Sequence, residues 1–115
     1  MHELSIALSL VQIAEEAARR AEAEHVTEVH IVVGALSGAV PEALQFAYDV
    51  AARGTLLEGS RLVIESLPVA IYCDGCEAER ELPGIQSFHC PVCGIPSGLV
   101  VRGKELELRA LEVEP

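Results

Sequence analysis

Hydrophobic residues recur at helical spacing through the first part of the chain, from Glu3 to about Glu24. One stripe of these residues follows the helical period and a second set widens it, so we expect the first half of this helix to be buried on nearly all sides. The stripe contains Leu4, Ala7, Leu8, Val11 and Ala14, and the widening set contains Ile6, Leu10, Ile13 and Ala17. The second half turns polar, which predicts a solvated helix face.

Strand and helix patterns then alternate along the chain. A β-branched run at 29–33, ending at Gly34, predicts a strand. A second helix is predicted to start at Pro41 and to be capped at Gly54, since proline suits a first helical turn and glycine a C-terminal cap. Further strands are predicted at 61–65 and 104–114. We therefore expect an α+β fold, in which two helices pack on a small three-stranded sheet.

Four cysteines lie between the last two of these strands, as Cys73-x-x-Cys76 and Cys90-x-x-Cys93, with thirteen residues between the pairs. Two such pairs can place four thiolates around one zinc ion. The alternatives are a disulfide framework and a dithiol redox protein. A redox pair needs only one Cys-x-x-Cys motif, usually near a helix N-terminus, and this segment has no helical period. We therefore predict structural zinc in a zinc-ribbon-like subdomain.

The position of the cysteines predicts two domains. Residues 1–71 and 100–115 are expected to form the α+β domain, and residues 72–99 an inserted zinc-binding subdomain. An insertion is joined by two peptide links, which limit relative motion more than a single linker does.

Composition and charge argue against several classes of function. Eight basic and eighteen acidic residues give a formal net charge of −10, which argues against binding to nucleic acid. The start lacks the pattern of a signal peptide, and no apolar run approaches the roughly 20 residues of a membrane span. We therefore expect a cytoplasmic protein, whose thiols stay reduced. Neither a hydrolase elbow nor a nucleotide-binding loop is present, so we expect no enzymatic activity and no catalytic residues.

The first three residues, Met1, His2 and Glu3, form a second metal-binding pattern. The α-amine of Met1, together with the amide and imidazole nitrogens of His2, can close two fused chelate rings around one ion. Nitrogen donors in this arrangement favour Ni(II) or Cu(II). Glu3 can add its amide or its carboxylate. The alternative is that the start is incidental and that Glu3 only complements the helix dipole.

Three segments, at 1–7, 33–38 and 41–48, together with the paired Cys-x-x-Cys motifs, closely resemble the HypA family of hydrogenase maturation nickel chaperones. The resemblance covers essentially the whole chain. It implies that Met1, His2 and Glu3 bind nickel as cargo. It also implies a structural zinc ion, whose ligands are Cys73, Cys76, Cys90 and Cys93.

The resemblance further implies two partners, a HypB-type GTPase and the large-subunit precursor of a [NiFe] hydrogenase; urease maturation proteins are additional candidates. The alternative function is a zinc-ribbon adaptor for protein interactions that carries no nickel. A homodimer in which two protomers exchange the first helix is also possible, because the apolar end of this helix would pack equally well on a partner.

The chain contains three further histidines, His25, His30 and His89. His89 directly precedes Cys90, so it could replace a thiolate or hydrogen-bond to a zinc-bound sulfur. We expect His25 to lie at the end of the first helix, and His30 to be either a strand histidine with its hydrogen bonds satisfied or a surface histidine. Neither has a carboxylate or cysteine at ligand spacing.

Overall fold

The computed structural model describes residues 2–115, and these residues form two helices and six strands. The chain divides into two compact units. The first comprises Met1–Val32, Ala39–Glu65 and Glu107–Pro115, and the second comprises Val33–Gly38 and Ser66–Leu106. The division into two domains expected from the sequence stays a prediction, with residues 1–71 and 100–115 in one domain and 72–99 in the other. Within the described residues, neither helix is long and apolar enough to cross a membrane.

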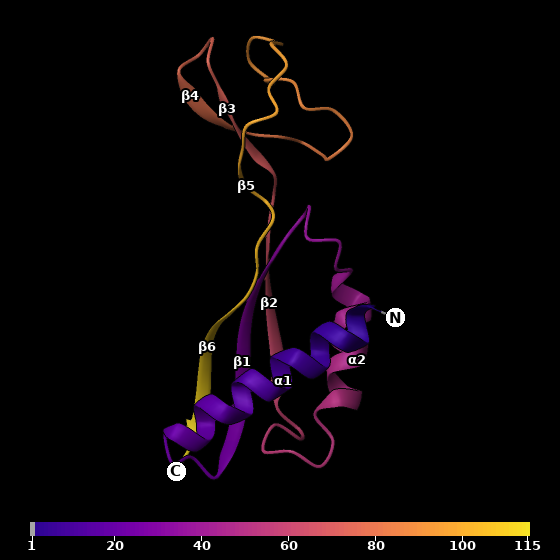
Figure 1. Cartoon of the computed structure of the whole chain (residues 1–115), viewed down its shortest axis with the longest axis vertical. Coiled ribbons are helices and arrows are strands. Elements are labelled where there is room, and N and C mark those ends of the chain that lie inside the picture. The colour runs from indigo at the N-terminus through magenta and orange to yellow at the C-terminus, as the bar shows by residue number, and fades with distance from the viewer. Residues whose placement is uncertain (1) are drawn as a thin grey trace. The chain divides into compact units, whose positions relative to one another are not determined.

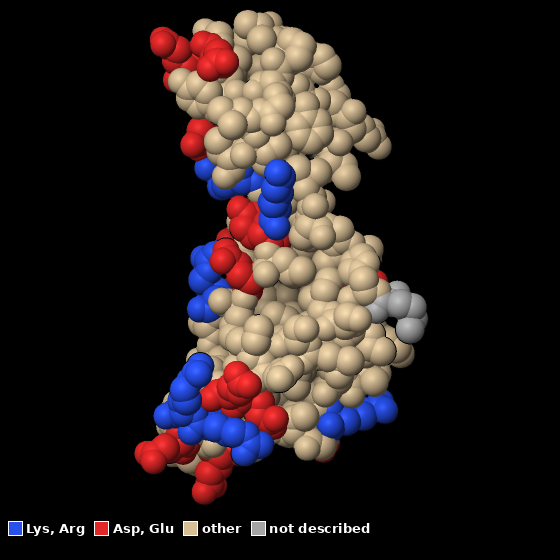
Figure 2. All heavy atoms as spheres, in the orientation of Figure 1, with Lys and Arg blue, Asp and Glu red and all other residues tan. Residues whose placement is uncertain are grey.

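The first helix, α1, spans His2–Arg20 and buries one face. That face consists of Ala7, Leu10, Val11, Ala14 and Ala18. The side chains of Leu8 and Ile13 are about half exposed, so the expectation of burial on nearly all sides was wrong. The polar second half is confirmed, because charged side chains gather over that end of α1, whereas its first half is largely uncharged on the visible face (Figure 2).

Helix α1 ends four residues earlier than predicted, because Glu22 adopts a left-handed conformation with φ of 57°. The N–H of Ala23 then bonds back to the carbonyl of Ala18 at 3.0 Å, which closes the helix end with an ordinary C-terminal motif.

Three strands of the first sheet run in the order β2-β1-β6. They are β1 (His25–Gly34), β2 (Arg61–Leu67) and β6 (Leu106–Glu114). Helix α1 lies across one face of this sheet, beside α2 (Pro41–Ala51) (Figure 1). The expected α+β class, with two helices on a three-stranded sheet, is confirmed.

Strand β1 begins four residues before the predicted start, so His25 belongs to a strand and not to the end of the first helix. Its polar first half is held by the C-terminal strand. The N–H of Glu24 bonds to the carbonyl of Glu114, and the Thr27 hydroxyl bonds to the carbonyl of Glu112. Pairing with a distant strand therefore stabilises the extended structure of a segment in which His25 and Glu28 interrupt the β-branched pattern.

The core of the first unit combines aliphatic side chains of β1 with one face of α2. Its largest fully buried members are Val26, Val29, Ile31, Val32, Leu44, Tyr48 and Leu57. Tyr48 brings a hydroxyl into this core, where it lies 2.5 Å from the Ser60 hydroxyl. Each buried hydroxyl thus has a hydrogen-bond partner, as burial requires.

The second unit contains a small antiparallel sheet that the sequence patterns did not predict. Its strands are β3 (Ala70–Cys73), β4 (Ala78–Glu81) and β5 (Val100–Arg102), in the order β4-β3-β5. They have only three or four residues each, too few to show a periodic pattern. A small core packs beneath them, formed by Val69, Ile71 and Leu82 with Leu36, Phe88 and Val100.

Two glycines allow a close backbone approach inside the second unit. A Cβ atom on Gly34 would lie 2.2 Å from the carbonyl oxygen of Gly103, which is far inside van der Waals contact. Gly103 itself has φ of 121°. The approach is fastened by hydrogen bonds from the N–H of Gly34 to the carbonyl of Glu105 and from Leu36 to that of Gly103. Glycine at position 34 is therefore a requirement of the fold.

Candidate metal centres

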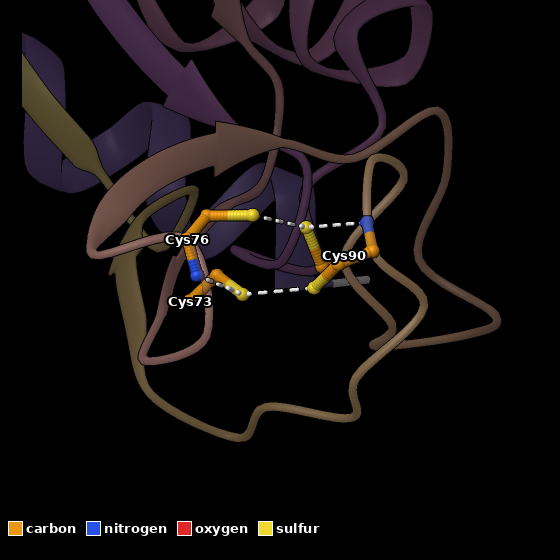
Figure 3. A group of neighbouring side chains, drawn as sticks. Cys73, Cys76 and Cys90 are labelled. Carbon is orange, nitrogen blue, oxygen red and sulfur yellow. Dashed lines mark hydrogen bonds between the residues drawn. The ribbon is translucent and has the colours of Figure 1, made fainter.

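The four cysteines come together in the second unit. Cys73 ends β3, Cys76 lies in the turn to β4, and Cys90 and Cys93 come from a second turn of the same spacing. Their four sulfur atoms all lie within 4.8 Å of one another. The Cys73 and Cys93 sulfurs are 3.4 Å apart. The sulfurs of Cys76 and Cys90, both labelled in Figure 3, are 3.8 Å apart. The two Cys-x-x-Cys motifs thus form one four-sulfur cluster.

This cluster fits a zinc ion. Four sulfurs at the usual zinc–sulfur distance of 2.3 Å form a tetrahedron with edges of about 3.8 Å, close to the separations found here. A disulfide bond needs sulfurs about 2.05 Å apart, and all four cysteines are free. Cys73 and Cys90 are buried, Cys76 is half-buried and Cys93 is exposed, so one side of the cluster faces solvent. The donor set and its geometry therefore match a structural zinc site of the zinc-ribbon type.

Backbone N–H groups point at two of the four sulfur atoms, those of Cys73 and Cys90. The N–H groups of Cys93 and Val92 point at the Cys90 sulfur at 3.5 and 3.4 Å, and Cys76 N–H points at the Cys73 sulfur at 3.4 Å. Donation from Cys93, followed by that from Val92, outweighs burial and lowers the pKa of the Cys90 thiol to about 6. The N–H of Ile95 acts to lower the pKa of the Cys93 thiol. Contact with the sulfurs of Cys73 and Cys90 outweighs this N–H and raises the Cys93 pKa to about 12. In the metal-free cluster, Cys90 is therefore the cysteine that most readily forms a thiolate.

Arg80 is a residue of this site that the sequence reasoning missed. The sulfur of Cys76, and then that of Cys90, raises the pKa of the Arg80 guanidinium. The Arg80 side chain thus places a positive charge beside two of the four thiolates, whose charges zinc would only half neutralise. One sequence signal could have found it, because Arg80 is the only lysine or arginine between the two cysteine pairs.

His89 does not join the sulfur cluster in the structure. Its ring is exposed, and its Nδ1 atom lies 2.6 Å from the hydroxyl of Ser87. The hypothesis that His89 replaces a thiolate gains no support from this position.

At the N-terminus, the structure brings two of the three expected nickel ligands together, while Met1 lies outside the described residues. His2 Nε2 is 3.1 Å from a carboxylate oxygen of Glu3. The same oxygen accepts a hydrogen bond from the N–H of Val40 at 3.3 Å. Burial alone would raise the pKa of Glu3, but this N–H and the neighbouring His2 hold the pKa below its ordinary value. Glu3 therefore presents an ionised carboxylate beside an imidazole.

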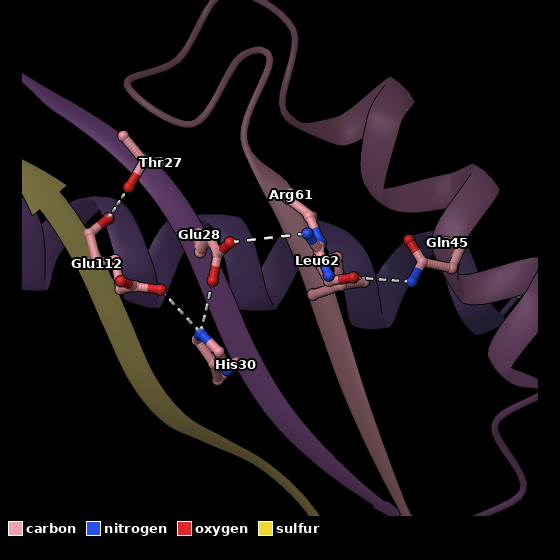
Figure 4. Close-up of polar contacts among 7 residues, drawn as sticks. All are labelled: Thr27, Glu28, His30, Gln45, Arg61, Leu62 and Glu112. Atoms are coloured by element: carbon pink, nitrogen blue, oxygen red, sulfur yellow. Dashed lines mark hydrogen bonds and ion pairs between the residues drawn. The ribbon is translucent and has the colours of Figure 1, made fainter.

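His30 lies in β1, as expected, but the prediction that it has no carboxylate at ligand spacing was wrong. Its Nε2 atom lies 3.0 Å from a carboxylate oxygen of Glu28 and 3.3 Å from one of Glu112 (Figure 4). Glu28 is two positions away on the same strand, a spacing that could have been noticed. Glu112 lies on β6, and only the pairing of distant strands brings it there. His25 has a similar but simpler contact, with Glu114 at 3.5 Å.

Comparison with known proteins places this arrangement in context. The family model described as "Hydrogenase/urease nickel incorporation, metallochaperone, hypA" matches residues 1–113. The chain belongs to the HypA family. The hydrogenase maturation factor HypA of Roseiflexus sp. (strain RS-1) is 54% identical over 114 residues, covering 99% of this chain and 93% of that protein. The HypA of Chloroflexus aurantiacus (strain ATCC 29366) is 48% identical over 112 residues, covering 97% and 98% of the two chains.

Solved structures of HypA proteins share the fold. The solution structure of the Ni metallochaperone HypA from Helicobacter pylori has a TM-score of 0.67 at 22% identity, covering 97% of both chains. A second solution structure of a HypA protein has a TM-score of 0.71 at 24% identity, covering 98% of this chain and 96% of the other. The resemblance to the HypA family noted from the sequence is confirmed, and with it the class of metallochaperone involved in hydrogenase or urease maturation.

Proposed function

We propose that this chain binds Ni(II) through Met1, His2 and Glu3 and delivers it during maturation of a [NiFe] hydrogenase. The observation that carries the proposal is the pairing of His2 with an ionised Glu3 at the start of α1, in a member of a nickel-incorporation family. The hydrogenase maturation factors of Roseiflexus and Chloroflexus, which are about half identical, support the same role.

The ligand chemistry of this segment suits transport. The amine of Met1 and the amide and imidazole of His2 would bind the ion, with Glu3 as a supporting ligand. The side chain of His2 is 57% exposed, so a partner protein can attack the metal and replace its ligands one at a time. A tetrathiolate set offers no open position for such an exchange.

The zinc ion would have a different task. Cys73, Cys76, Cys90 and Cys93 would hold it, and when bound it supplies a cross-link between the two turns. Zinc in this role stabilises the second unit and takes no part in nickel transfer.

The partners follow from the same proposal. A HypB-type GTPase and the large-subunit precursor of the hydrogenase are the expected partners, with urease maturation proteins as an additional pathway. We propose a cytoplasmic carrier without enzymatic turnover. Exchange of α1 between two protomers stays a prediction of the sequence.

The test is a nickel titration of tag-free, zinc-loaded protein with an authentic N-terminus, run beside His2→Ala. We expect the wild type to bind one more nickel equivalent than the variant, while zinc content is unchanged. His89→Ala is the matched control, because it removes an exposed imidazole from the zinc-bearing unit and should leave nickel binding intact. Equal nickel binding by the wild type and His2→Ala would refute the carrier role and leave the zinc-ribbon adaptor as the remaining function.

A further inference from the structure

We infer that Glu28, His30 and Glu112 form an additional, exchangeable binding site for a divalent transition-metal ion on the first sheet. The inference is independent of the proposed nickel site, because its ligands come from β1 and β6 and include none of the first three residues. The class of ion is a late first-row metal such as Ni(II), Co(II) or Zn(II).

The distances between the donor atoms suit a single ion. One atom from each of the three side chains lies within 4.8 Å of the others, and His30 Nε2 is 3.0 and 3.3 Å from the two carboxylates. Two ligands bound at about 2.1 Å and at right angles to each other are about 3.0 Å apart. His30 Nε2 is therefore spaced from each carboxylate like a neighbouring ligand on one metal ion, and the two carboxylates lie within 4.8 Å of each other.

The donor types select the metal. An imidazole suits zinc, copper, iron and nickel, whereas magnesium and calcium prefer an all-oxygen set. One nitrogen and two carboxylate oxygens also leave several coordination positions for water. The site is therefore open, unlike the four-thiolate cluster.

The charges at this place favour a bound cation. Glu28 and Glu112 bring two carboxylates together across neighbouring strands, which is unfavourable when nothing lies between them. A neutral His30 ring can offer only one hydrogen at Nε2, although that atom faces both carboxylates. Arg61 approaches only the outer oxygen of Glu28, at 4.0 Å. A divalent ion would compensate both carboxylates and use the imidazole lone pair at the same time.

The site also has room and access. In Figure 4, α1 passes behind the strands, so the three side chains lie on the face of the sheet that α1 leaves uncovered. An open hollow of about 260 Å³ on this face is lined by His30 and Glu112, together with Val63 and Arg109. Water can therefore complete the coordination, and the ion can exchange with solution.

The experiment adds Ni(II) alone to zinc-loaded His2→Ala protein, in which the N-terminal chelate is absent. We expect one equivalent of nickel to bind, and we expect affinity to fall at least tenfold in His2→Ala/His30→Ala and in His2→Ala/Glu28→Gln. Paramagnetic broadening in the amide NMR spectrum should centre on residues 28–30 and 111–113. Circular dichroism of each variant verifies that the fold is intact.

Two controls lie on the same strands. His25→Ala removes an imidazole from β1 that faces one carboxylate, Glu114, and Glu107→Gln removes a charge from β6 where Glu107 pairs with Arg109. Both should retain the nickel equivalent in the His2→Ala background. Identical titrations of His2→Ala with and without His30→Ala, or broadening centred elsewhere, would overturn the inference and leave a plain ion pair. The proposed N-terminal site is judged separately, from the difference between the wild type and His2→Ala.

Discussion

The two candidate metal-binding regions differ in how much of the protein is needed to build them. The ligands proposed for nickel are consecutive residues at the start of α1, and the His2 side chain is more than half exposed. The ligands proposed for zinc come from two turns, and the sulfur-bearing residues Cys73 and Cys90 are buried. A short terminal chelate needs little scaffold and can be approached by a partner, whereas the cysteine cluster requires a folded unit around it.

This difference suits two tasks, the delivery of a metal ion to another protein and the stabilisation of a fold by a metal ion. A metal that is to be handed over must keep ligands that a partner can displace, and an exposed terminus provides them. A metal that stabilises a fold is bound by ligands that come together only in the folded chain, so its binding energy becomes folding energy. Under the proposed function, holding the two tasks in separate units would allow nickel to leave without unfolding the protein.

The largest effect is expected from breaking the zinc cluster with Cys73→Ser. Structural zinc contributes about 10–16 kcal/mol of apparent binding energy in small zinc domains, and a hydroxyl is a poor replacement for a thiolate. We expect zinc to be lost and the amide NMR signals of residues 70–102 to collapse, while signals of the first unit, such as those of Val29 and Leu44, keep their dispersion.

The control for this variant is His89→Ala, which should keep zinc because the His89 ring contacts Ser87 and lies outside the sulfur cluster. If Cys73→Ser instead retained zinc with nearly the affinity of the wild type, the four-thiolate assignment would be wrong and another ligand would have to be sought.

The second unit also depends on a backbone contact, which Gly34→Ala should break. The added Cβ would meet the Gly103 carbonyl, and because both atoms belong to the main chain, no side chain can move to relieve the clash. We expect a loss of about 3 kcal/mol or more in the free energy of unfolding, measured by urea denaturation of zinc-loaded protein. Gly38→Ala is the matched control, since its Cβ would meet open space. Its positive φ should cost only about 1–2 kcal/mol. Similar losses in both variants would contradict the steric explanation.

These cases show which features the sequence could reveal. The two helices, the three longer strands and the four-sulfur cluster were predictable, because helical period, β-branched runs and cysteine spacing are local signals. The contact of Gly34 with Gly103 and that of His30 with Glu112 depend on segments about 70 and 80 residues apart, so no local pattern encodes them. The exposure of Leu8 and Ile13 could not be predicted either, because the hydrophobic pattern of a helix does not say which of its sides other elements cover.

A smaller effect is expected in the first unit from Tyr48→Phe. The substitution removes one partner of a buried hydroxyl pair and leaves the Ser60 oxygen without it, which should cost about 1–2 kcal/mol. Ser60→Ala in turn leaves the buried Tyr48 hydroxyl without its hydrogen-bond partner. The double variant should therefore cost less than the sum of the two single variants, as measured by thermal denaturation. Strict additivity would show that the two hydroxyls do not stabilise each other. Zinc content should stay unchanged in all three variants.

The smallest effect is expected at the proposed nickel site, where Glu3→Gln tests how far the position of the candidate ligands depends on the fold. The Glu3 carboxylate accepts a hydrogen bond from Val40, and its pKa is held below its ordinary value of 4.5. A lowered pKa in the folded state means that the ionised group stabilises the protein above about pH 4.5 and that this contribution disappears as the pH falls through the folded value. In nickel-free protein we therefore expect Glu3→Gln to melt slightly below the wild type at pH 7 and at the same temperature near pH 3.

Glu42→Gln, which removes an exposed acid from the first turn of α2, should show a smaller dependence on pH. A difference between wild type and Glu3→Gln that stays constant from pH 7 to pH 3 would contradict this role. If this pH dependence is found and nickel affinity also falls in Glu3→Gln, the Glu3 carboxylate both stabilises the folded protein and binds the metal. The fold would then help to position a ligand of the proposed nickel site.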